Sequence, residues 1–479
     1  MQLTKIVATV GPSTLHADGI KQFIEHGVTV FRFNFKHNEP SWHSDGIALV
    51  NKVADEVGVP VTTMIDLQGP SIRINMPTDD LQITEGEKLY FGQDVFTEDH
   101  KGISLTHPHI IESLEDGQEV LADDGSFQFT LKQESGQTYL ISHTSGLLKN
   151  HKNFNIPGAD FPFPVLVDRD FEGLKVASQS EVDYIALSFV RSAQDVADLR
   201  EEMKKYAIDA HVISKIETKK ALDNIDEIIE ASDAIMVARG DLGVELPYEE
   251  VPYYQKMIIE KCLERSKPVI TATQMLNSMI TAPQPTRAEV SDVANAIYDL
   301  TDAVMLSGET ASGEYPYKAV KTMQKVCIFN EGKMMYDIRH RYDLKLTDNE
   351  ARICDMAYNL FISFAKGDVK NFAGFLVFTQ SGRTARLMSR YRSRPDVPIF
   401  AFTHTKQVRD RLALSFGVFP SLIEDIEHSA AVGEDDIIRS IEFLKESGKV
   451  STGQSLIVLH GDVWAQEGGT STVKLVEIG

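Results

Sequence analysis

The chain has 479 residues, which is more than one ordinary domain needs and predicts roughly two to three domains. With 42% apolar and 25% charged residues, it has the composition of a globular protein with a core of normal size. Because 48 basic residues stand against 70 acidic ones, the formal charge is −22, which argues against nucleic acid or an anionic membrane surface as a general partner. An anionic substrate therefore needs locally clustered lysine, arginine and metal.

The three cysteines, Cys262, Cys327 and Cys354, follow no paired or metal-binding spacing and lie in helix-like apolar patterns. We expect buried free thiols. The sequence shows no secretory leader after Met1 and no apolar run long enough to span a bilayer. We therefore expect a cytoplasmic protein without a membrane partner.

From Lys5 onward, apolar β-branched segments alternate with amphipathic segments of helical period. The predicted strands are Lys5–Val10, Val28–Phe33, Val59–Ile65, Tyr184–Leu187, His211–Ile216, Ala234–Val237, Pro268–Ala272 and Ala303–Leu306. The predicted helices between them include Asp18–His26, Ala193–Lys205, Tyr248–Glu264 and Arg287–Tyr298. About eight such units favour a closed parallel (β/α)8 TIM barrel over an open doubly wound sheet.

The alternation stops between the third and fourth predicted strands. After Gly69-Pro70 come short alternating runs with turn signals such as Asp116-Gly117. This pattern predicts a small β-rich domain over residues 71–164, inserted into a barrel loop where it acts as a lid. The barrel domain then comprises residues 1–70 and 165–342.

A third region follows Tyr342. It contains a predicted helix, Asn349–Lys366, and the predicted strands Phe375–Phe378, Pro398–Phe402 and Ser455–Leu459. We expect a separate C-terminal α/β domain, residues 343–479, built on an open sheet.

The chemistry is predicted where the strand His211–Ile216 ends. Lys215 and Glu217 are two residues apart, so their side chains share one face of a strand. Asp241 follows the next apolar strand. Such a set suits a divalent cation on Glu217 and Asp241, with Lys215 facing a phosphate. The alternative is a solvated lysine–glutamate pair on the surface.

Other predicted strands also end in polar residues. In a (β/α) barrel, catalytic groups lie at the carboxyl ends of the strands, so these residues are expected at one rim. They are Arg32, Asn34, Asp66, Ser188, Gly240, Thr273 and Ser307-Gly308-Glu309-Thr310. A threonine in the position of Thr273 is also commonly a turn residue bonded to the backbone.

Several motifs together make the chain resemble pyruvate kinase from end to end. They are Thr4-Lys5-Ile6-Val7-Ala8-Thr9-Val10-Gly11-Pro12-Ser13, Arg32-Phe33-Asn34-Phe35, Ser214-Lys215-Ile216-Glu217, Met236-Val237-Ala238-Arg239-Gly240-Asp241-Leu242-Gly243, Ala272-Thr273-Gln274-Met275-Leu276, Pro285-Thr286-Arg287-Ala288-Glu289 and Met305-Leu306-Ser307-Gly308-Glu309-Thr310. The resemblance implies transfer of the phosphoryl group of phosphoenolpyruvate to ADP, giving pyruvate and ATP. It also implies Mg²⁺ or Mn²⁺ as cofactor and a homotetramer.

Site roles follow from the resemblance residue by residue. It assigns the phosphoryl group in transfer to Lys215 and the metal to Glu217 and Asp241. It places Thr273 beside the substrate carboxylate and the carbon that is protonated, and the backbone amide of Gly240 at the same carboxylate. Phosphate or nucleotide contacts are implied for Arg32, which also counts as catalytic, and for Arg73, His37 and Lys152. Asp124 approaches the nucleotide when the lid closes; Asp124 and Lys152 are otherwise surface charges.

Two motifs differ from the family. The chain reads Asp66-Leu67-Gln68-Gly69-Pro70-Ser71-Ile72-Arg73 for the usual Asp-Thr-Lys-Gly-Pro-Glu-Ile-Arg, and Asn34-Phe35-Lys36-His37 for Asn-Phe-Ser-His. Two of four expected potassium ligands are thus replaced, while Asn34 and Asp66 remain. We hypothesise that the Lys36 ammonium occupies the potassium position with Asp66 as its partner, so that potassium is not required. The alternative is that Lys36 points to solvent or into an altered substrate site.

In the third region, Thr379-Gln380-Ser381-Gly382-Arg383-Thr384 follows a strand and starts a helix. This segment resembles the effector-phosphate loop of allosterically activated pyruvate kinases. It implies a sugar-phosphate effector bound by Thr379, Gln380, Ser381, Gly382 and Thr384. The alternative is a helix cap without an effector.

Two other functions remain open at this stage. The replacements at Lys36, Leu67, Gln68 and Ser71 motivate a sensor that binds the same metabolites but turns them over poorly. A barrel lyase or aldolase acting through a metal enolate needs no nucleotide lid, so the predicted insertion argues against it.

Overall fold

The computed structural model describes residues 1–91, 101–159, 161–334, 342–365, 371–392, 397–423, 432–461 and 469–479. Eight parallel strands close into a barrel in the order β1-β17-β16-β15-β14-β13-β3-β2. The strands are β1 (Lys5–Thr9), β2 (Val28–Asn34), β3 (Thr62–Asp66), β13 (Tyr184–Leu187), β14 (His211–Ile216), β15 (Ala234–Ala238), β16 (Val269–Ala272) and β17 (Ala303–Leu306). The predicted (β/α)8 barrel is confirmed.

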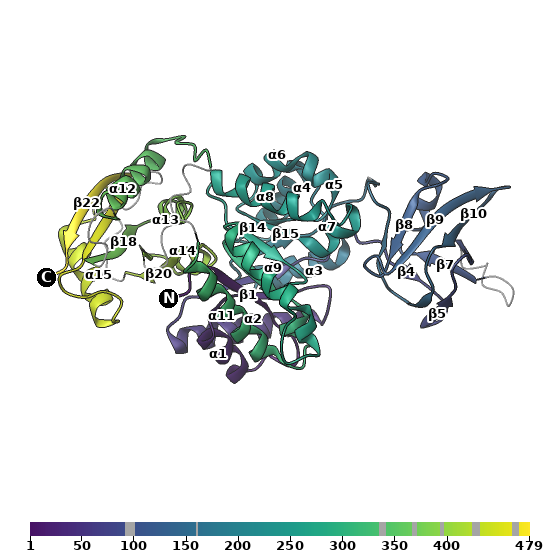
Figure 1. Ribbon diagram of the computed structural model, residues 1–479, viewed down its shortest axis with the longest axis horizontal. Coiled ribbons are helices and arrows are strands. Elements are labelled where there is room, and N and C mark those ends of the chain that lie inside the picture. Colours follow the sequence, from purple (N-terminus) through teal and green to yellow (C-terminus); the bar gives the residue numbers. More distant parts are fainter. Residues whose placement is uncertain are drawn as a thin grey trace.

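Helices form the outer layer of the barrel (Figure 1). They are α1 (Ala17–Glu25), α2 (Pro40–Val57), α3 (Asp168–Ser178), α4 (Ala193–Lys205), α5 (Lys219–Asp223), α6 (Ile225–Ala231), α7 (Arg239–Glu245), α8 (Val251–Glu264), α9 (Arg287–Tyr298), α10 (Gly308–Ala311) and α11 (Pro316–Glu331), with a 3-10 turn η3 at Asn277–Ile280. Local chemistry fixes several starts. At the start of α9 the Thr286 hydroxyl accepts a hydrogen bond from the Glu289 amide, and the Glu289 carboxylate accepts one from the Thr286 amide. This reciprocal pair is a capping box.

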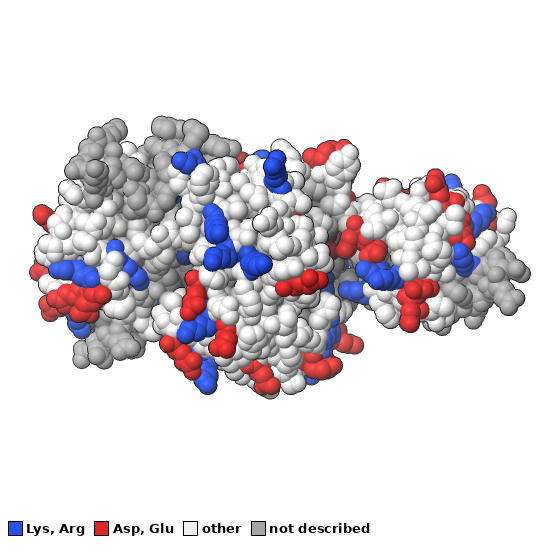
Figure 2. Space-filling view, turned by 60° about the horizontal axis from the view of Figure 1, so that its bottom comes forward, with Lys and Arg blue, Asp and Glu red and all other residues white. Residues whose placement is uncertain are grey.

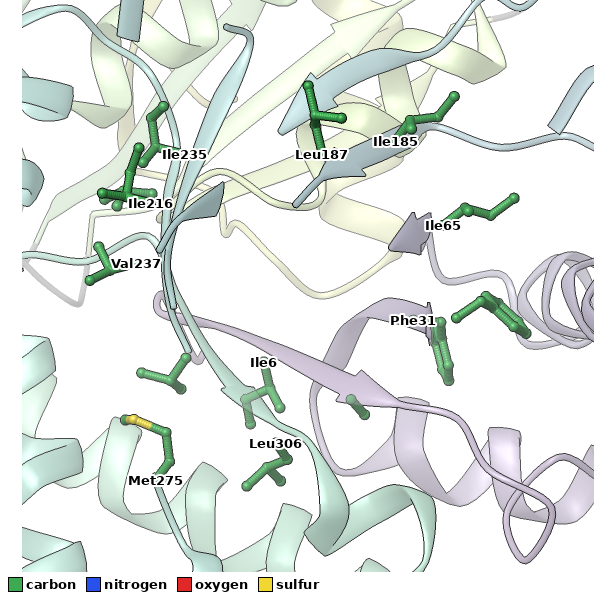
Figure 3. Packing of buried hydrophobic residues seen from close by; sticks show 14 of the residues in the cluster. Ile6, Phe31, Ile65, Ile185, Leu187, Ile216, Ile235, Val237, Met275 and Leu306 are labelled. Carbon is green, nitrogen blue, oxygen red and sulfur yellow. The ribbon is translucent and has the colours of Figure 1, made fainter. Parts of the chain in front are cut away.

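Side chains along the barrel strands alternate between two cores. Ile6, Phe31, Ile65 and Ile216 are among those that pack outward against the helices (Figure 3). Val7, Val30, Met64 and Ile213 fill the barrel interior. Because the side-chain period of a strand is two, Arg32 follows Val30 inward, Asp66 follows Met64, and Lys215 and Glu217 follow Ile213. The strand register therefore brings these charged groups together at the carboxyl rim.

Between β3 and α3 the chain forms two sheets apart from the barrel, in which the strands pair antiparallel except β6 and β7, which pair in parallel. A seven-stranded sheet has the order β12-β8-β9-β10-β6-β7-β4, and β11 pairs with β5. The bounds are β4 (Ile74–Asn75), β5 (Asp80–Ile83), β6 (Lys88–Phe91), β7 (Lys101–Leu105), η2 (Pro108–Ser113), β8 (Glu119–Ala122), β9 (Phe127–Glu134), β10 (Gln137–Ser142), β11 (Gly146–Lys149) and β12 (Phe154–Asn155). These strands enclose a hydrophobic core of their own. We call them the lid; the domain limits at residues 71, 164 and 343 stay predictions.

The C-terminal region is built on a five-stranded sheet of order β20-β19-β18-β21-β22, in which β22 alone is antiparallel. Its elements are α12 (Asn349–Ala365), β18 (Phe372–Phe378), α13 (Arg383–Ser389), β19 (Ile399–Thr403), α14 (Lys406–Leu412), β20 (Val418–Leu422), α15 (Glu434–Glu446), β21 (Ser455–Gly461) and β22 (Thr470–Glu477). The lid and this sheet lie at opposite ends of the molecule (Figure 1). The open-sheet α/β architecture predicted for this region is confirmed.

Two further observations concern the three cysteines and the lengths of the apolar helices. Cys262, Cys327 and Cys354 are buried free thiols, as predicted, and burial raises the pKa of all three. Within the described ranges, no helix has both the length and the apolar character that a membrane crossing requires.

Candidate active site

Lys215 lies at the centre of the polar rim, where β14 ends. Its ammonium Nζ is 2.8 Å from Glu217 Oε1 and 3.2 Å from Asp66 Oδ1, and it donates to Ser188 Oγ at 2.8 Å. The side chain is only 5% exposed. Burial acts to lower the pKa of Lys215, but the charges of Asp66, Glu217 and Asp241 outweigh it and raise the pKa. This lysine is therefore a permanent, buried cation.

Asp66, at the end of β3, bridges two cations. Its Oδ2 accepts from Arg32 Nε at 2.6 Å, while its Oδ1 faces Lys215. Against the cost of burial, Lys215, Arg32 and Lys36 lower the pKa of Asp66 to about 2. Arg32 is fixed further by donating from Nη1 to Thr9 Oγ1 at 2.9 Å. Thr9 was not among the predicted site residues, although its position at the end of β1 could have identified it.

Glu217 and Asp241 are the residues predicted to bind the metal. One Glu217 oxygen, Oε2, accepts from the backbone amide of Phe189 at 2.7 Å. The other, Oε1, is buried and makes no hydrogen bond, although Lys215 lies beside it. Burial and the like charge of Asp241 raise the pKa of Glu217, although Lys215 acts in the opposite direction. Asp241 stands in the first turn of α7, directly after β15.

The donor chemistry of this pair fits a divalent cation. Carboxylate oxygens are the ligands that Mg²⁺ and Mn²⁺ prefer, and a Mg²⁺ site with one or two carboxylates is completed by water or phosphate oxygens. Among the residues that the structure describes, no group of three or more His, Cys, Asp and Glu is arranged to hold a metal.

Thr273 follows β16 in an unusual conformation. Its φ of 68° is left-handed, a region that a β-branched residue rarely enters. The Thr273 hydroxyl accepts from the Gly240 amide at 2.7 Å and donates to Ala272 O at 2.7 Å. Arg239 Nη2 donates to Thr273 O at 2.7 Å, and Arg239 Nη1 pairs with Asp292 at 2.7 Å. Arg239, to which the sequence analysis gave no role, therefore holds the strained turn.

Lys36 does not pair with Asp66 as the sequence-based hypothesis states. Both oxygens of Asp66 already face Arg32 and Lys215, and Lys36 makes no ion pair in the described part of the chain. Its ammonium lies over the ring of Phe189, 5.6 Å from the centroid. Phe189 holds this position with a φ of 55°, which sequence patterns do not reveal.

The half-buried Lys36 side chain still lies among the charges of the rim. Burial lowers the pKa of Lys36, and the charge of Lys215 acts in the same direction, whereas Asp241, Glu217 and Asp66 oppose them. The side-chain oxygen of Asn34 accepts from the Lys36 amide at 3.2 Å and fixes the turn. Leu67 points the other way, into the outer core of the barrel.

A cavity of about 610 Å³ separates this rim from the lid. Its lining includes Lys36, His37 and Asp241 from the barrel. From the lid come Arg73, Asp124 and Lys152, so of the nucleotide residues implied by the sequence only Arg32 is outside the lining. Lys152 pairs with Asp123 at 2.7 Å, and Arg73 donates to His151 O at 2.8 Å. Burial, Arg73, Lys36 and Arg32 lower the pKa of His37, so it is neutral at pH 7.

Comparisons with known proteins agree with this geometry. A family model described as "Pyruvate kinase, barrel domain" matches residues 1–320, and one described as "Pyruvate kinase, alpha/beta domain" matches residues 367–476. The chain belongs to the pyruvate kinase family. It is 37% identical to pyruvate kinase of Geobacillus stearothermophilus over 478 residues, which cover 98% of this chain and 80% of that protein.

Two clostridial members of the family match over almost their whole length. Pyruvate kinase of Clostridium acetobutylicum is 37% identical over 480 residues, covering 99% of both chains. Pyruvate kinase of Clostridium perfringens is 36% identical over 490 residues, covering 100% of both. A phosphotransferase of the pyruvate kinase type is therefore the function of this chain. Nothing in the comparisons favours the weakly active sensor or the lyase.

The segment that resembles an effector-phosphate loop is engaged by the protein itself. Thr384 Oγ1 donates to Glu350 Oε1 at 2.6 Å and contacts Thr470 Oγ1 at 2.8 Å. Arg383 pairs with Asp348 at 2.6 Å and also with Glu350. A phosphate at Thr384 must therefore compete with a carboxylate. The role of this loop stays a prediction.

Proposed function

We propose that the chain transfers the phosphoryl group of phosphoenolpyruvate to ADP at the rim formed by Lys215, Glu217 and Asp241, and that it does so without potassium. The observation that carries the proposal is the Lys215 ammonium, buried between Asp66 and Glu217 at the carboxyl rim of the barrel, beside Asp241, which lines the cavity under the lid. Phosphoryl transfer demands positioning and charge stabilisation more than covalent chemistry, and this arrangement supplies both.

Lys215 and Arg32 carry positive charge toward the substrate phosphate. Because the pKa of Lys215 is raised, the lysine remains protonated and donates to phosphoryl oxygens throughout the transfer. Asp66 fixes both cations by pairing one carboxylate oxygen with each of them. Glu217 and Asp241 would hold a divalent cation, which would supply further positive charge to the phosphoryl group.

Thr273 and Gly240 are proposed to bind the substrate carboxylate. In this structure the Gly240 amide donates a hydrogen bond to the Thr273 hydroxyl. A carboxylate oxygen of the substrate can accept from both groups in place of this hydrogen bond. The hydroxyl then lies beside the carbon that becomes the methyl group of pyruvate and can hold the proton delivered there. The strained backbone at Thr273 fixes its orientation.

The lid is proposed to bind ADP. Arg73 and Lys152 offer cations to the nucleotide phosphates across the cavity, and neutral His37 lies on the opposite wall. Figure 2 shows acidic and basic side chains mixed over the visible face, so anion binding has to come from such local clusters. Closure of the lid excludes water from the transfer.

Lys36 is proposed to replace the potassium ion. Before a divalent cation binds, Asp66, Glu217 and Asp241 contribute three negative charges, which Arg32, Lys215 and Lys36 balance with three positive ones. A serine in place of Lys36 removes one of these positive charges, which a bound monovalent cation can supply instead. Lys36 thus acts through the whole cluster and not through Asp66 alone.

A coupled steady-state assay tests this function. The chain is mixed with phosphoenolpyruvate, ADP and MgCl₂ in a buffer whose only monovalent cation is tetramethylammonium. We expect full turnover, with less than about twofold stimulation by KCl. A strict dependence on K⁺ contradicts the role of Lys36, and absence of turnover with K⁺ present contradicts the assigned activity. A homotetramer and a sugar-phosphate effector remain proposals that gel filtration and the same assay address.

A further inference from the structure

We propose that a second cavity, at the junction of the barrel with the C-terminal region, binds a small phosphorylated anion. This cavity of about 470 Å³ is lined by the starts of barrel strands, through His211, Asp233 and Lys267, by Arg386 of α13, and by Arg390 directly after that helix. It therefore lies at the opposite end of the barrel from Lys215. Its volume is within the range of small-molecule sites.

Arg390 is the residue that points to a ligand. The residue is only 3% exposed, and among the described residues its Nε and Nη2 groups have no hydrogen-bond partner. Its Nη1 group donates to Lys345 O at 3.2 Å and to Glu264 O at 3.4 Å. The neighbouring Tyr391 hydroxyl bonds to Asp355 at 3.2 Å and also interacts with the Arg390 side chain, which acts to lower the pKa of Tyr391 against the larger, raising effect of burial. A buried guanidinium with two free donor groups is costly unless an acceptor, such as a phosphate, fills the cavity.

The cavity carries an excess of positive charge. Among described residues its lining has six cationic side chains, Arg265, Lys267, Lys345, Arg383, Arg386 and Arg390, against three carboxylates, Glu230, Asp233 and Glu264. No ion pair involves Lys267, Lys345, Arg386 or Arg390 in the described part of the chain. Asp233 is already neutralised by Arg200 at 2.8 Å. In a chain of net charge −22, such a concentration of unpaired cations favours a multiply charged anion.

The geometry distinguishes this cavity from the loop at residues 379–384. Lys267 donates to Ser232 O at 2.6 Å and so belongs to the barrel, which places half of the site outside the C-terminal region. Arg386 Nη1 donates to Ser381 O at 3.2 Å and connects the cavity to that loop. An anion that draws Arg386 and Arg390 toward Lys267 therefore joins the barrel to the C-terminal sheet. The inference does not depend on which reaction the rim catalyses.

Calorimetric titration of inorganic phosphate into the full chain tests the proposal. Because phosphate also suits the active site, the titration is made on Lys215→Met as well as on the wild type. We expect a binding event that Lys215→Met retains and that Arg390→Met weakens by at least about tenfold. Arg439→Met, at an exposed arginine of α15, is the matched control and leaves binding unchanged.

A second variant tests the proposal even if Arg390→Met does not fold. Lys345 is exposed, so Lys345→Met is expected to fold normally and to weaken phosphate binding by about threefold or more. Binding that is equal in the wild type, Arg390→Met and Lys345→Met overturns the proposal. So does the loss of all phosphate binding in Lys215→Met, or an equal heat from chloride at matched ionic strength.

Discussion

Replacement of Lys36 by serine restores the residue usual in the family and removes one of three cations from the rim. The rim then carries one positive charge fewer beside a substrate phosphate that is itself negative. A unit charge at about 5 Å, in surroundings of effective dielectric constant about 20, contributes about 3 kcal/mol. This energy corresponds to a loss of about 150-fold in kcat/KM for phosphoenolpyruvate in the absence of potassium.

The assay is the coupled reaction in tetramethylammonium buffer with KCl as the variable. For Lys36→Ser we expect low activity without K⁺ and partial recovery with it, because Leu67 still offers no side-chain oxygen. Lys52→Ser, at a 71% exposed side chain on α2, is the control and changes neither activity nor its cation dependence. Lys36→Ser with wild-type activity in the absence of K⁺ refutes the reasoning.

Three further changes give separate predictions. Lys152→Ala raises the KM for ADP by about threefold to tenfold and leaves the KM for phosphoenolpyruvate unchanged, since the lysine lies on the lid; equal changes in both constants contradict a nucleotide role. Glu217→Gln raises the Mg²⁺ concentration for half-maximal rate at least about tenfold, as a Mg²⁺ titration measures. Asp183→Asn removes a pH dependence of stability. Burial, aided by the charge of Asp410, raises the pKa of Asp183 to about 7, so the folded chain holds a proton that the unfolded chain releases near pH 4. That stabilisation, at most about 4 kcal/mol, is present below pH 4 and lost as the pH rises through 7. Urea unfolding at pH 5 and pH 8 shows a smaller loss of stability in Asp183→Asn than in the wild type, since Glu245, whose pKa burial also raises to about 7, is unchanged; an equal loss in both contradicts the prediction.

The sequence predicted the elements whose boundaries are set locally. The bounds of α4, α9, β13, β14 and β17 agree with prediction. They depend on apolar periodicity and on caps such as the Thr286–Glu289 box, which can be recognised in the local sequence. Strand β18 starts three residues earlier than expected. Its register shifts around Gly374, which has a φ of 142° and interrupts the apolar run that marks the strand. The helices α2, α3 and α11 were not predicted.

The sequence predicted which charged residues lie together at the rim, but not which of them form ion pairs with each other. Lys215, Glu217 and Asp66 lie together because the alternation of three separate strands points them inward, which a period of two already implies. The partner of Lys36 was not predictable, since it depends on Arg32 and Lys215 occupying Asp66 first. It also depends on the left-handed backbone of Phe189, which is set by contact with Glu217 and not by neighbouring residues.

The most direct test of the account is the kcat of Lys215→Met with saturating phosphoenolpyruvate, ADP and MgCl₂. Methionine keeps most of the volume of the side chain and removes the charge that faces Asp66, Glu217 and the substrate. We expect a fall in kcat of at least about 1,000-fold with unchanged circular dichroism. A folded Lys215→Met enzyme that retains more than about a tenth of the wild-type kcat contradicts the claim that a buried ammonium at this rim stabilises the phosphoryl group in transfer.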